Sequence, residues 1–405
     1  MRRLLWILFI ICACGDDAAV IPDAATVTPD ADLTCQPQSA IGAFYRRAPT
    51  PRFIAGRMFT DGKLDTAIAD PDLRWDCAAW HLYYQTPHGD TFDPPGPMII
   101  RHATSPDLVT WAFDEAAALT VSDAGAWDAA NTETPTVIEN PDAPADRRYL
   151  MLYSGAAGAL PGYGFPAYAI GAAVSADGVT FTRVSAAESP HAEEGLVLTG
   201  ADVYPGAAGA IVADPEIALL DGTYHLWFSS FACSGENCAT VDAFGIGHAT
   251  STDGIHWSVE AAPITSLLRS SADPRSGGEQ PSVIYDALHC RWEMWLTSDE
   301  ATDTDGQPVT FDNMAGVWHA TSTNGTTWSI NYQQARDLTW DPDAAGEHLG
   351  LLTGADVGAK ENGRYLVYVG FDDQDVPTGS FLPDGSEAGF RAGVMTLNLA
   401  TRDAP

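Results

Sequence analysis

The sequence predicts an all-β fold built from copies of one sheet, and three recurring segments carry this prediction. The first segment occurs four times, as HATSPDLVTW from His102, AAVSADGVTF from Ala172, HATSTDGIHW from His248 and HATSTNGTTW from His319. The second is a short aromatic stretch upstream of each copy, starting at His81, Tyr149, Tyr224 and Trp292, and a fifth time at Tyr365. The third is an extended stretch centred on Pro71, Pro135, Pro215 and Pro281, with a fifth copy from Gly354 that lacks the proline.

The spacing of these copies fits a β-propeller. The repeated segment recurs after 70, 76 and 71 residues, which is too long for a helical solenoid repeat. Each copy predicts strand, turn, strand, turn, strand, with tight hairpins at Asp177-Gly178, Asp253-Gly254 and Asn324-Gly325. Five aromatic strands therefore predict a five-bladed β-propeller whose inner strands line a central channel. Two stacked β-sandwiches are the alternative, but they give no reason for so regular a repeat.

The amino terminus predicts export. Residues 1–14 combine three opening residues that include two arginines, an apolar run and a small-residue site ending at Cys14, which resembles a bacterial lipoprotein signal with Cys14 as the lipidated residue. An ordinary secretory signal is the alternative. Residues 15–40 are rich in Asp, Ala, Pro and Thr and predict a flexible tether, which leaves residues 41–405 for the propeller. We expect a protein anchored by lipid to the bacterial outer membrane or cell surface.

The cysteines agree with an oxidising compartment. Cys233 and Cys238 flank a four-residue loop and are expected to form a local disulfide. Cys35 with Cys77 is a second expected pair, which leaves Cys290 unpaired. No cysteine pair has the spacing of a metal site, so we assign them structural roles.

The charge excludes two classes of partner. The chain has 54 acidic and 20 basic residues, giving a net charge of −34. Such a surface repels nucleic acid and anionic lipid, so contact with a membrane is expected through the lipid anchor alone. We expect a monomer in solution.

Carboxylates recur beside the central prolines. Asp70 and Asp214 directly precede proline, whereas Glu133 and Glu279 stand one residue earlier. An isolated Asp before Pro is a common turn former, but these four lie within two residues of the proline in four predicted inner strands. The propeller therefore predicts that they converge on the channel.

These motifs resemble the five-bladed propeller glycoside hydrolases, with glycoside hydrolase family 43 the most similar and the fructan-acting and mannoside-acting propeller families as neighbours. The resemblance rests on Ala69-Asp70-Pro71-Asp72, Ala213-Asp214-Pro215-Glu216 and Glu279-Gln280-Pro281, and extends at fold level from about residue 67 to 399. It implies that Asp70 is the general base, Asp214 tunes pKa and orients, and Glu279 is the general acid. It also implies inversion at the anomeric carbon, for which the two carboxyl groups stand about 6.5–9.5 Å apart.

The chain departs from the family pattern at Gln280, which replaces the usual small residue beside the acid. Glu133 occupies the place in the second copy that Glu279 has in the fourth, so a sugar-hydroxyl ligand, a rival acid and a strand-end residue are all open interpretations. Trp127 and Trp340 precede inner strands and are candidates for stacking on sugar faces. No metal ligand is assigned and no cofactor is expected, although a structural calcium is compatible with the fold. The repeat histidines are expected to be structural.

The predicted function is a surface-anchored glycosidase that cleaves a polysaccharide or oligosaccharide by carboxylate acid–base catalysis with Asp70, Asp214 and Glu279. The alternative is a propeller lipoprotein that binds or scaffolds glycans without turnover. Retention of the three carboxylates in order favours the enzyme.

Overall fold

The computed structural model confirms an almost entirely β architecture. It describes residues 44, 46–54, 56–90, 96–159, 166–235, 238–268, 277–287, 289–297, 316–332, 337–339, 341, 343–344, 352–360, 363–372 and 394–402. Within these ranges the helices are the single turn α1 (Gly200–Val203) and 3-10 turns at Ala145–Arg147 and Thr265–Leu267. None of these helices has the length and apolar character needed to cross a membrane. The predicted signal with Cys14 and the tether lie outside the described residues.

Antiparallel pairing joins the strands into successive sheets in chain order. The first two sheets contain β4 (Ala69–Trp75), β5 (Trp80–Gly89), β6 (Met98–Ser105) and β7 (Ala112–Phe113), then β8 (Asn131–Glu139), β9 (Tyr149–Ala156), β10 (Ala169–Ser175) and β11 (Thr182–Arg183). One parallel pair, Met98 of β6 with Asn131 of β8, joins these two into a single ten-stranded sheet. The next two contain β13 (Gly209–Leu220), β14 (Thr223–Ser234), β15 (Thr240–Ser251) and β16 (Ser258–Ala261), then β17 (Glu279–Asp286), β18 (Arg291–Thr297), β19 (Gly316–Ser322) and β20 (Ser329–Ile330). The last contains β22 (Leu352–Lys360), β23 (Gly363–Asp372), β24 (Val394–Arg402) and the early strand β1 (Arg46–Arg47). Shorter strands at the sheet edges are β2 (Phe53–Ile54), β3 (Leu64–Asp65), β12 (Leu196–Leu198) and β21 (Leu338–Thr339).

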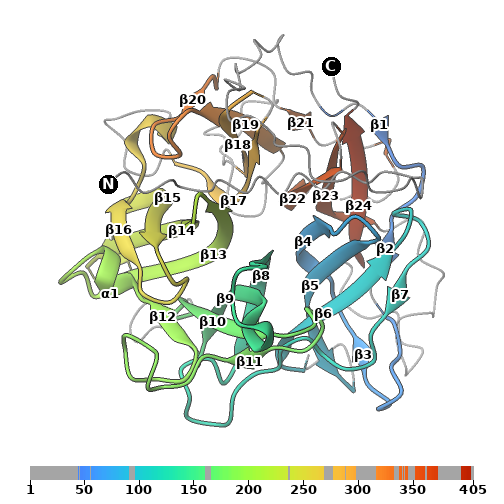
Figure 1. Cartoon of the computed structure of the whole chain (residues 1–405), viewed down its shortest axis with the longest axis horizontal. Helices are drawn as coiled ribbons and strands as arrows, with labels where there is room; N and C mark the ends of the chain where they lie inside the picture. The colour runs from blue at the N-terminus through green and yellow to red at the C-terminus, as the bar shows by residue number, and fades with distance from the viewer. Residues whose placement is uncertain are drawn as a thin grey trace, which may run out of the picture.

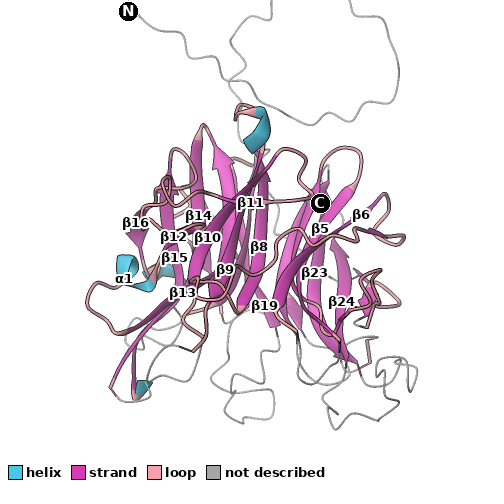
Figure 2. Cartoon of the chain, turned by 90° about the horizontal axis from the view of Figure 1, so that it is seen from below, coloured by secondary structure: helices cyan, strands magenta, loops and turns pink. Residues whose placement is uncertain are grey.

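The first strand of each sheet lies at the centre of the molecule. Figure 1 shows β4, β8, β13, β17 and β22 nearest the middle, and each of them contacts the next, with β22 also contacting β4. The strands run from one end of the molecule to the other, and most loops gather at these ends (Figure 2). Pairing of β1 with β24 joins the first and last strands of the described residues in one sheet. The sheets thus surround a common axis onto which their inner strands face.

The hydrophobic core is divided into clusters between neighbouring sheets. One cluster joins Leu152 of β9 to Leu226 and Phe228 of β14, and comparable clusters fill the spaces between the other neighbouring sheets. A sheet covered on both faces requires apolar residues on both sides of its central strands. This explains the aromatic stretches of the sequence, which form the second strand of each sheet.

The repeated ten-residue segment forms the third strand of a sheet and the turn that follows it. In the third copy, the Ser251 hydroxyl and the His256 amide donate to Oδ1 of Asp253, at 3.0 and 2.8 Å. The turn of the second copy docks on the preceding sheet, where the Tyr83 hydroxyl donates to the carbonyl of Gly178 at 2.6 Å. The repeat therefore reflects how one sheet packs on the next.

Two of the repeat histidines are buried within these sheets. His102 contacts His81 at 2.9 Å and Asp114 at 2.6 Å, and His248 contacts His225 at 3.2 Å. Burial lowers the pKa of His102 and holds that of His248 at about 4, so both are neutral at pH 7.

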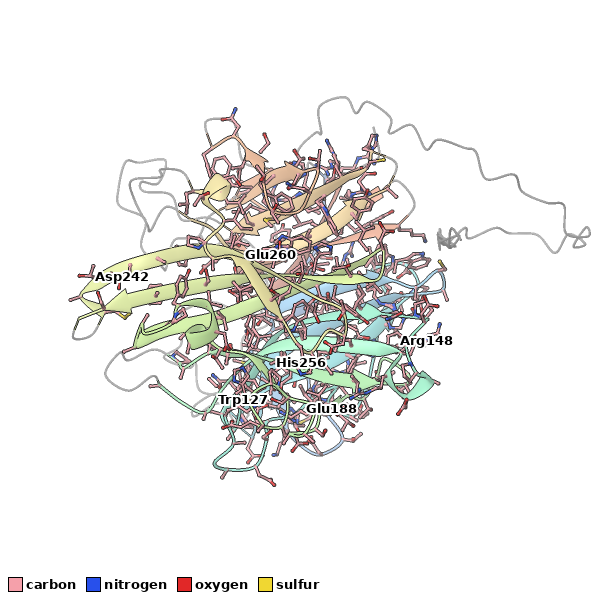
Figure 3. All side chains as sticks on the ribbon, turned by 60° about the vertical axis from the view of Figure 1, so that its left-hand side comes forward. Trp127, Arg148, Glu188, Asp242, His256 and Glu260 are labelled. Atoms are coloured by element: carbon pink, nitrogen blue, oxygen red, sulfur yellow. A yellow bond between two sulfur atoms is a disulfide. The ribbon has the colours of Figure 1, made fainter. Side chains whose placement is uncertain are left out.

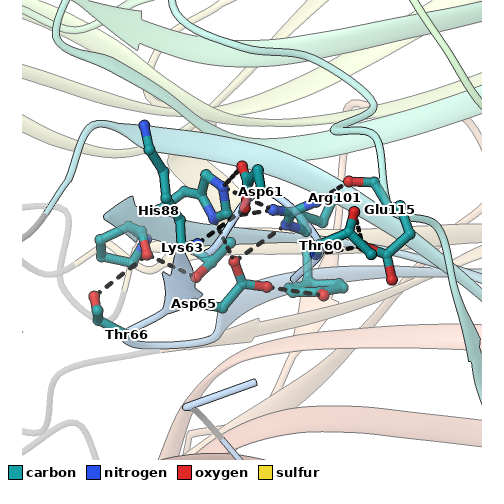
Figure 4. A network of polar contacts seen from close by, with 11 residues as sticks. Thr60, Asp61, Lys63, Asp65, Thr66, His88, Arg101 and Glu115 are labelled. Atoms are coloured by element: carbon teal, nitrogen blue, oxygen red, sulfur yellow. Dashed lines mark hydrogen bonds and ion pairs between the residues drawn. The ribbon is translucent and has the colours of Figure 1, made fainter. Parts of the chain in front are cut away.

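A buried ion network lies beside the first sheet (Figure 4). Oδ1 of Asp65 accepts from Nε of Arg101 at 3.1 Å, and it lies 3.1 Å from Nδ1 of His88. Nε2 of His88 lies 2.8 Å from Oδ2 of Asp61, while Arg101 also donates to the carbonyl of Glu115 at 3.0 Å. Arg101 and Asp65 are 1% and 2% exposed, so each compensates the other in the interior.

Cys233 and Cys238 form a disulfide across the loop between β14 and β15. Cys290 is also disulfide-bonded, so the expectation that it is the unpaired cysteine is wrong. The predicted pairing of Cys35 with Cys77 involves a residue outside the described ranges. Pairing depends on which loops the fold brings together, and the spacing of cysteines along the chain does not reveal this.

Candidate active site

Each inner strand is interrupted at the same position. Pairing with the second strand of the sheet breaks between Ala69 and Asp72 in β4, and at the equivalent place in β8, β13, β17 and β22. The first residue within each break has a left-handed backbone, with φ of 41° at Asp70, 45° at Thr134, 50° at Asp214, 50° at Gln280 and 54° at Gly354. Proline follows the left-handed residue in four of the five strands, because the backbone at that position donates no hydrogen bond to the paired strand. Such bulges turn a side chain out of the sheet, here toward the axis.

The interruptions meet at one pocket on the axis. Its lining comes from all five inner strands, namely Asp70, Pro71, Thr134, Pro135, Asp214, Pro215, Glu216, Gln280, Pro281, Gly354, Ala355 and Asp356. Non-glycine residues in the left-handed region cost roughly 1–3 kcal/mol each and persist where the surroundings fix them. Strain repeated around one pocket is typical of a functional site.

Side chains of neighbouring sheets hold the strained residues in place. The Thr134 amide donates to Oε1 of Gln85, the Asp214 amide to the Ser154 hydroxyl and the Gln280 amide to the Ser229 hydroxyl, at 2.8 to 2.9 Å. In each case the acceptor belongs to the second strand of the preceding sheet. The amides freed from the ladder are therefore satisfied between sheets, which fixes the pocket geometry.

Gln280 links Asp70 to the last inner strand. Its Nε2 donates to Oδ1 of Asp70 at 3.1 Å, and its Oε1 accepts from the Gly354 amide at 3.0 Å. A Cβ on Gly354 would lie 2.5 Å from the same Asp70 oxygen. The fifth copy therefore carries glycine because the Asp70 carboxylate occupies the space of a side chain.

Three carboxyl groups interact at this pocket: Asp70 and Asp214 line it, and Glu133 stands directly before the lining residue Thr134. Burial, followed by repulsion from Asp214 and then Glu133, raises the pKa of Asp70 well above its usual range. Burial raises the pKa of Asp214 to about 6, against a stabilising hydrogen bond from Ser229. Since like charges in one buried site cannot all be ionised, the pocket retains protons in the neutral range.

Glu133 is the best defined of the three. It is 8% exposed, and the Tyr168 hydroxyl donates to its two carboxylate oxygens, at 3.1 Å to Oε1 and 3.0 Å to Oε2. Burial raises the pKa of Glu133 to about 7, the Tyr168 hydrogen bond opposes the rise, and repulsion from Asp214 adds to it. Glu133 is thus a carboxyl group that gains or loses its proton near neutral pH.

The remaining predicted site residues are Glu279, Trp127 and Trp340. Glu279 is half-buried at the start of β17, directly before the pocket residue Gln280, as Glu133 stands before Thr134. Trp127 stacks on Tyr153 with ring centroids 5.8 Å apart and donates to the Glu194 carbonyl at 2.9 Å. Trp127 lies outside the pocket lining, on the side of the molecule seen in Figure 3. Trp340 lies outside the described residues.

Two further residues belong to this site. Tyr168 binds Glu133 from a segment 35 positions later, and Gln280 binds Asp70 from a position 210 residues later. Gln280 could be singled out from the sequence because it replaces the small residue that the family pattern has beside the acid. No pattern in the sequence indicated Tyr168, although it ends a long insertion in the second copy.

One wall beside the pocket is extended. β13, β14 and β15 are each 12 residues long, and in Figure 3 their hairpin projects past neighbouring strands to Asp242. At its base the hydroxyls of Tyr204 and Ser230 lie 2.9 Å apart. The extension places polar and aromatic side chains to one side of the axis.

Comparison with known proteins identifies the fold. No family model matches the sequence. Among solved structures, a complex of BT0996 with RGII matches with a TM-score of 0.60 at 14% identity, covering 88% of this protein and 92% of that one. A thermostable family-43 glycoside hydrolase matches with a TM-score of 0.52 at 15% identity, over 86% of this protein and 92% of that one. The catalytic domain of the Coprinopsis cinerea GH62 α-L-arabinofuranosidase gives 0.51 at 12% identity, over 89% and 98%. This protein therefore has the β-propeller fold of these glycoside hydrolases.

Proposed function

We propose that this protein is a glycoside hydrolase whose active site is the pocket on the axis of a five-bladed β-propeller. The observation that carries the proposal is the convergence of Asp70, Asp214 and Glu133 from three separate inner strands. Glycoside cleavage requires one protonated carboxyl group to donate to the leaving oxygen and one carboxylate to activate water or attack carbon. The blade count is supported by the five inner strands that contact one another in turn.

Asp70 is assigned as the general base and Asp214 as the residue that orients the site and shifts its proton affinities. Asp70 has a hydrogen bond from Gln280 that fixes its carboxylate, and Asp214 is held by the hydrogen bond from its amide to Ser154. These roles follow the family-43 resemblance of the Asp-Pro motifs, and the shared fold supports them.

The general acid is assigned to Glu279 by the same resemblance. Glu133 is the rival for this role, since its pKa of about 7 leaves it protonated at mildly acidic pH. If Glu279 is the acid, Glu133 contributes through a hydrogen bond to a sugar hydroxyl.

Activity is tested first with the full-length chain on nitrophenyl pentosides and hexosides, arabinan, xylan, fructan and RGII oligosaccharides. We include RGII and α-L-arabinofuranosides because two of the similar structures carry these names. Asp70→Asn should abolish turnover of whichever substrate is cleaved. Glycan binding without turnover in the unaltered protein would favour the glycan-binding alternative, and neither binding nor turnover would refute the carbohydrate assignment.

The identity of the acid is tested through the leaving group. A variant that lacks the acid should lose about 10²–10⁴-fold on a glycoside with a poor leaving phenol, but little on a 2,4-dinitrophenyl glycoside, which needs no proton. Glu279→Gln and Glu133→Gln are matched for this comparison. If only Glu133→Gln shows the dependence on leaving group, the assignment moves from Glu279 to Glu133.

We also propose that the protein is exported and anchored through lipid on Cys14. The supporting observation is the lipoprotein-like signal followed by an Asp- and Pro-rich tether. Expression of the full chain and of Cys14→Ser in a bacterial host, followed by membrane fractionation, tests it. The variant should move to the soluble fraction, and equal membrane retention of both would contradict the anchor.

A further inference from the structure

A cavity with charged and aromatic walls lies where the first sheet meets the last, away from the proposed active site. It has a volume of about 150 Å³ and is lined by two arginines, three aromatic residues, Asp65 and Ile68. None of its lining residues lines the pocket on the axis. A ligand bound here would therefore occupy a site separate from that of the proposed glycosidase.

The two arginines of the cavity, Arg52 and Arg57, are each fixed by a different sheet. Arg52 stands directly before β2, which pairs with β24 of the last sheet, and its amide donates to the Leu397 carbonyl at 2.7 Å. The Arg57 carbonyl accepts from the amide of Asp65 at 3.1 Å, and Asp65 belongs to β3, which pairs with β5 of the first sheet. Backbone hydrogen bonds thus hold both residues at the cavity.

Neither arginine forms an ion pair within the part of the chain that the structure describes. Arg52 is half-buried, and its Nε is buried without a hydrogen-bond acceptor. Arg57 is exposed, and its guanidinium carbon lies 4.0 Å from the ring centroid of Phe113. Acidic residues outnumber basic ones by 54 to 20 in this protein, so two neighbouring arginines without a carboxylate partner are unexpected.

The acidic groups that act on these arginines are engaged elsewhere. Burial lowers the pKa of Arg52 and the charge of Asp107 opposes this, but Oδ1 of Asp107 already accepts from two amides of its own turn. Hydrogen bonds from the amide and hydroxyl of Thr60 to Oε2 of Glu115, both 2.9 Å, lower the pKa of Glu115, and the charge of Arg57 adds to this. Both guanidinium groups therefore remain available to another anion.

Asp65 is the carboxyl group in the cavity wall, and its own partners compensate it. Oδ1 of Asp65 accepts from Nε of Arg101 at 3.1 Å (Figure 4), and Oδ2 accepts from the Tyr84 hydroxyl at 3.3 Å. Burial raises the pKa of Asp65, and the charge of Arg101 opposes the rise. Asp65 thus belongs to the buried ion network and does not pair with Arg52 or Arg57.

The rest of the cavity wall is apolar. Phe53 is buried, and its ring centroid lies 5.8 Å from that of Tyr84 and 5.1 Å from that of Phe113. The buried side chain of Ile68 completes this wall. An apolar cavity of about 150 Å³ is large enough to hold benzene. The cavity therefore combines space for one ring with two guanidinium groups.

We propose that this cavity binds a small carboxylate that carries one apolar or aromatic ring, of which benzoate is the simplest example. The ring would lie among the three aromatic side chains, and the carboxylate would accept hydrogen bonds from Arg52 and Arg57. Guanidinium groups bind carboxylates through strong, planar, paired hydrogen bonds. Inorganic phosphate has no apolar body to fill the cavity, and a neutral ring would leave both arginines without an acceptor.

Such a ligand would connect the first sheet to the last. Arg52 would contact it from the side of β2, whereas Arg57 and Phe113 would contact it from the first sheet. A ligand that binds only the folded state stabilises it by mass action. At 100 times its Kd, it should raise the melting temperature of a chain of this size by about 3–4 °C.

The test measures binding of benzoate to the full-length chain by isothermal titration calorimetry, with thermal unfolding as a second readout. We expect one binding site per chain. Acetate, which lacks the ring, should bind at least about 10-fold more weakly because it buries little apolar surface. Benzamide, the neutral analogue of the same shape, should also bind at least about 10-fold more weakly because it lacks the charge that strengthens hydrogen bonds to arginine.

Variants locate the ligand. Arg52→Met and Arg57→Met should each weaken benzoate binding by about 10-fold or more and reduce the preference for benzoate over benzamide. Arg148→Met, which removes an arginine of the surface ion pair with Glu139, is the matched control and should bind benzoate as wild type does. Asp70→Asn, in the pocket on the axis, should also bind benzoate as wild type does.

Several results would overturn the proposal. A wild-type protein that binds no benzoate at millimolar concentration, or binds acetate or benzamide as tightly, would do so. Unchanged benzoate binding in both Arg52→Met and Arg57→Met would also do so, and loss of binding in Asp70→Asn would place the ligand in the active-site pocket instead. If Arg52→Met does not fold, Arg57→Met decides, since the Arg57 side chain is exposed.

Discussion

Substitution of Gly354 by alanine tests the geometry around Asp70. The new Cβ would lie 2.5 Å from Oδ1 of Asp70, whereas ordinary contact begins at about 3.4 Å. The carboxylate must therefore retreat by about 0.9 Å, away from the position that Gln280 fixes. A misplacement of about 1 Å in a reacting group can cost about 10²-fold in rate.

The same substitution also costs stability through the backbone. Gly354 has a φ of 54°, and a left-handed conformation costs an alanine roughly 1–2 kcal/mol. Gly222, in the turn between β13 and β14, is a matched control, since its φ is 76° and no atom lies within 4 Å of a Cβ placed there. Gly222→Ala should carry the backbone cost without a clash at the site.

The assay compares kcat on the best substrate of the panel with the free energy of unfolding in urea. Both variants should lose about 1–2 kcal/mol of stability, but only Gly354→Ala should lose about 10²-fold in kcat. A folded Gly354→Ala with wild-type kcat would refute the reasoning that Asp70 must occupy this space to act. An equal loss of kcat in Gly222→Ala would show that strain alone impairs the enzyme.

The remaining predictions concern Glu133 and the buried ion network. Because the pKa of Glu133 is raised to about 7, its folded state holds a proton that the unfolded state releases near pH 4.5, so stability falls as pH rises from about 5 to 7. Unfolding of Glu133→Gln across this range should show a flatter pH dependence, and a slope equal to that of wild type would contradict the assignment. Tyr168→Phe removes a hydrogen bond that lowers the pKa of Glu133, so this pKa should rise. If activity falls when Glu133 loses its proton, the midpoint of that fall should move to higher pH, and an unchanged or lower midpoint would contradict this. Arg101→Met removes the guanidinium that binds the buried Asp65 and should lower the free energy of unfolding in urea by about 3–5 kcal/mol. Arg148→Met, at a half-exposed ion pair, should lower it by under about 1 kcal/mol. Similar losses in the two variants would show that burial does not determine the contribution of these ion pairs to stability.

The repeats of the sequence predict the sheets because the same residues make the same contacts in each copy. The Asp-Gly turns and the aromatic strands pack sheet against sheet, so the same residues are needed each time. The proline motifs likewise mark the interruption of the inner strands. From these positions the convergence of Asp70, Asp214 and Glu133 follows without knowledge of any distance.

Contacts that are not repeated from copy to copy could not be predicted in this way. Tyr168 reaches Glu133 because the end of an insertion between β9 and β10 lies beside the inner strand of the same copy, and the length and sequence of this insertion differ from copy to copy. Thr136 and Ser282 look like ordinary strand residues in the sequence, but their hydroxyls accept from the Ile217 and Val357 amides of the following sheets. The error at Cys290 has the same origin, since its bond depends on the arrangement of loops.

The repeated interruption of the inner strands also bears on how such a protein can diversify. The five strained positions hold four different residues, namely Asp, Thr, Gln and Gly, on a nearly constant backbone. The amides of Thr134, Asp214 and Gln280 are bound by side chains of the preceding sheet, and the Gly354 amide is bound by the Gln280 side chain. A substitution at Thr134 or Asp214 can therefore alter the groups that face the pocket while these backbone hydrogen bonds remain, whereas a side chain at Gly354 would displace Asp70. At these positions the contacts that hold the backbone are therefore separate from the side chains that supply the chemistry.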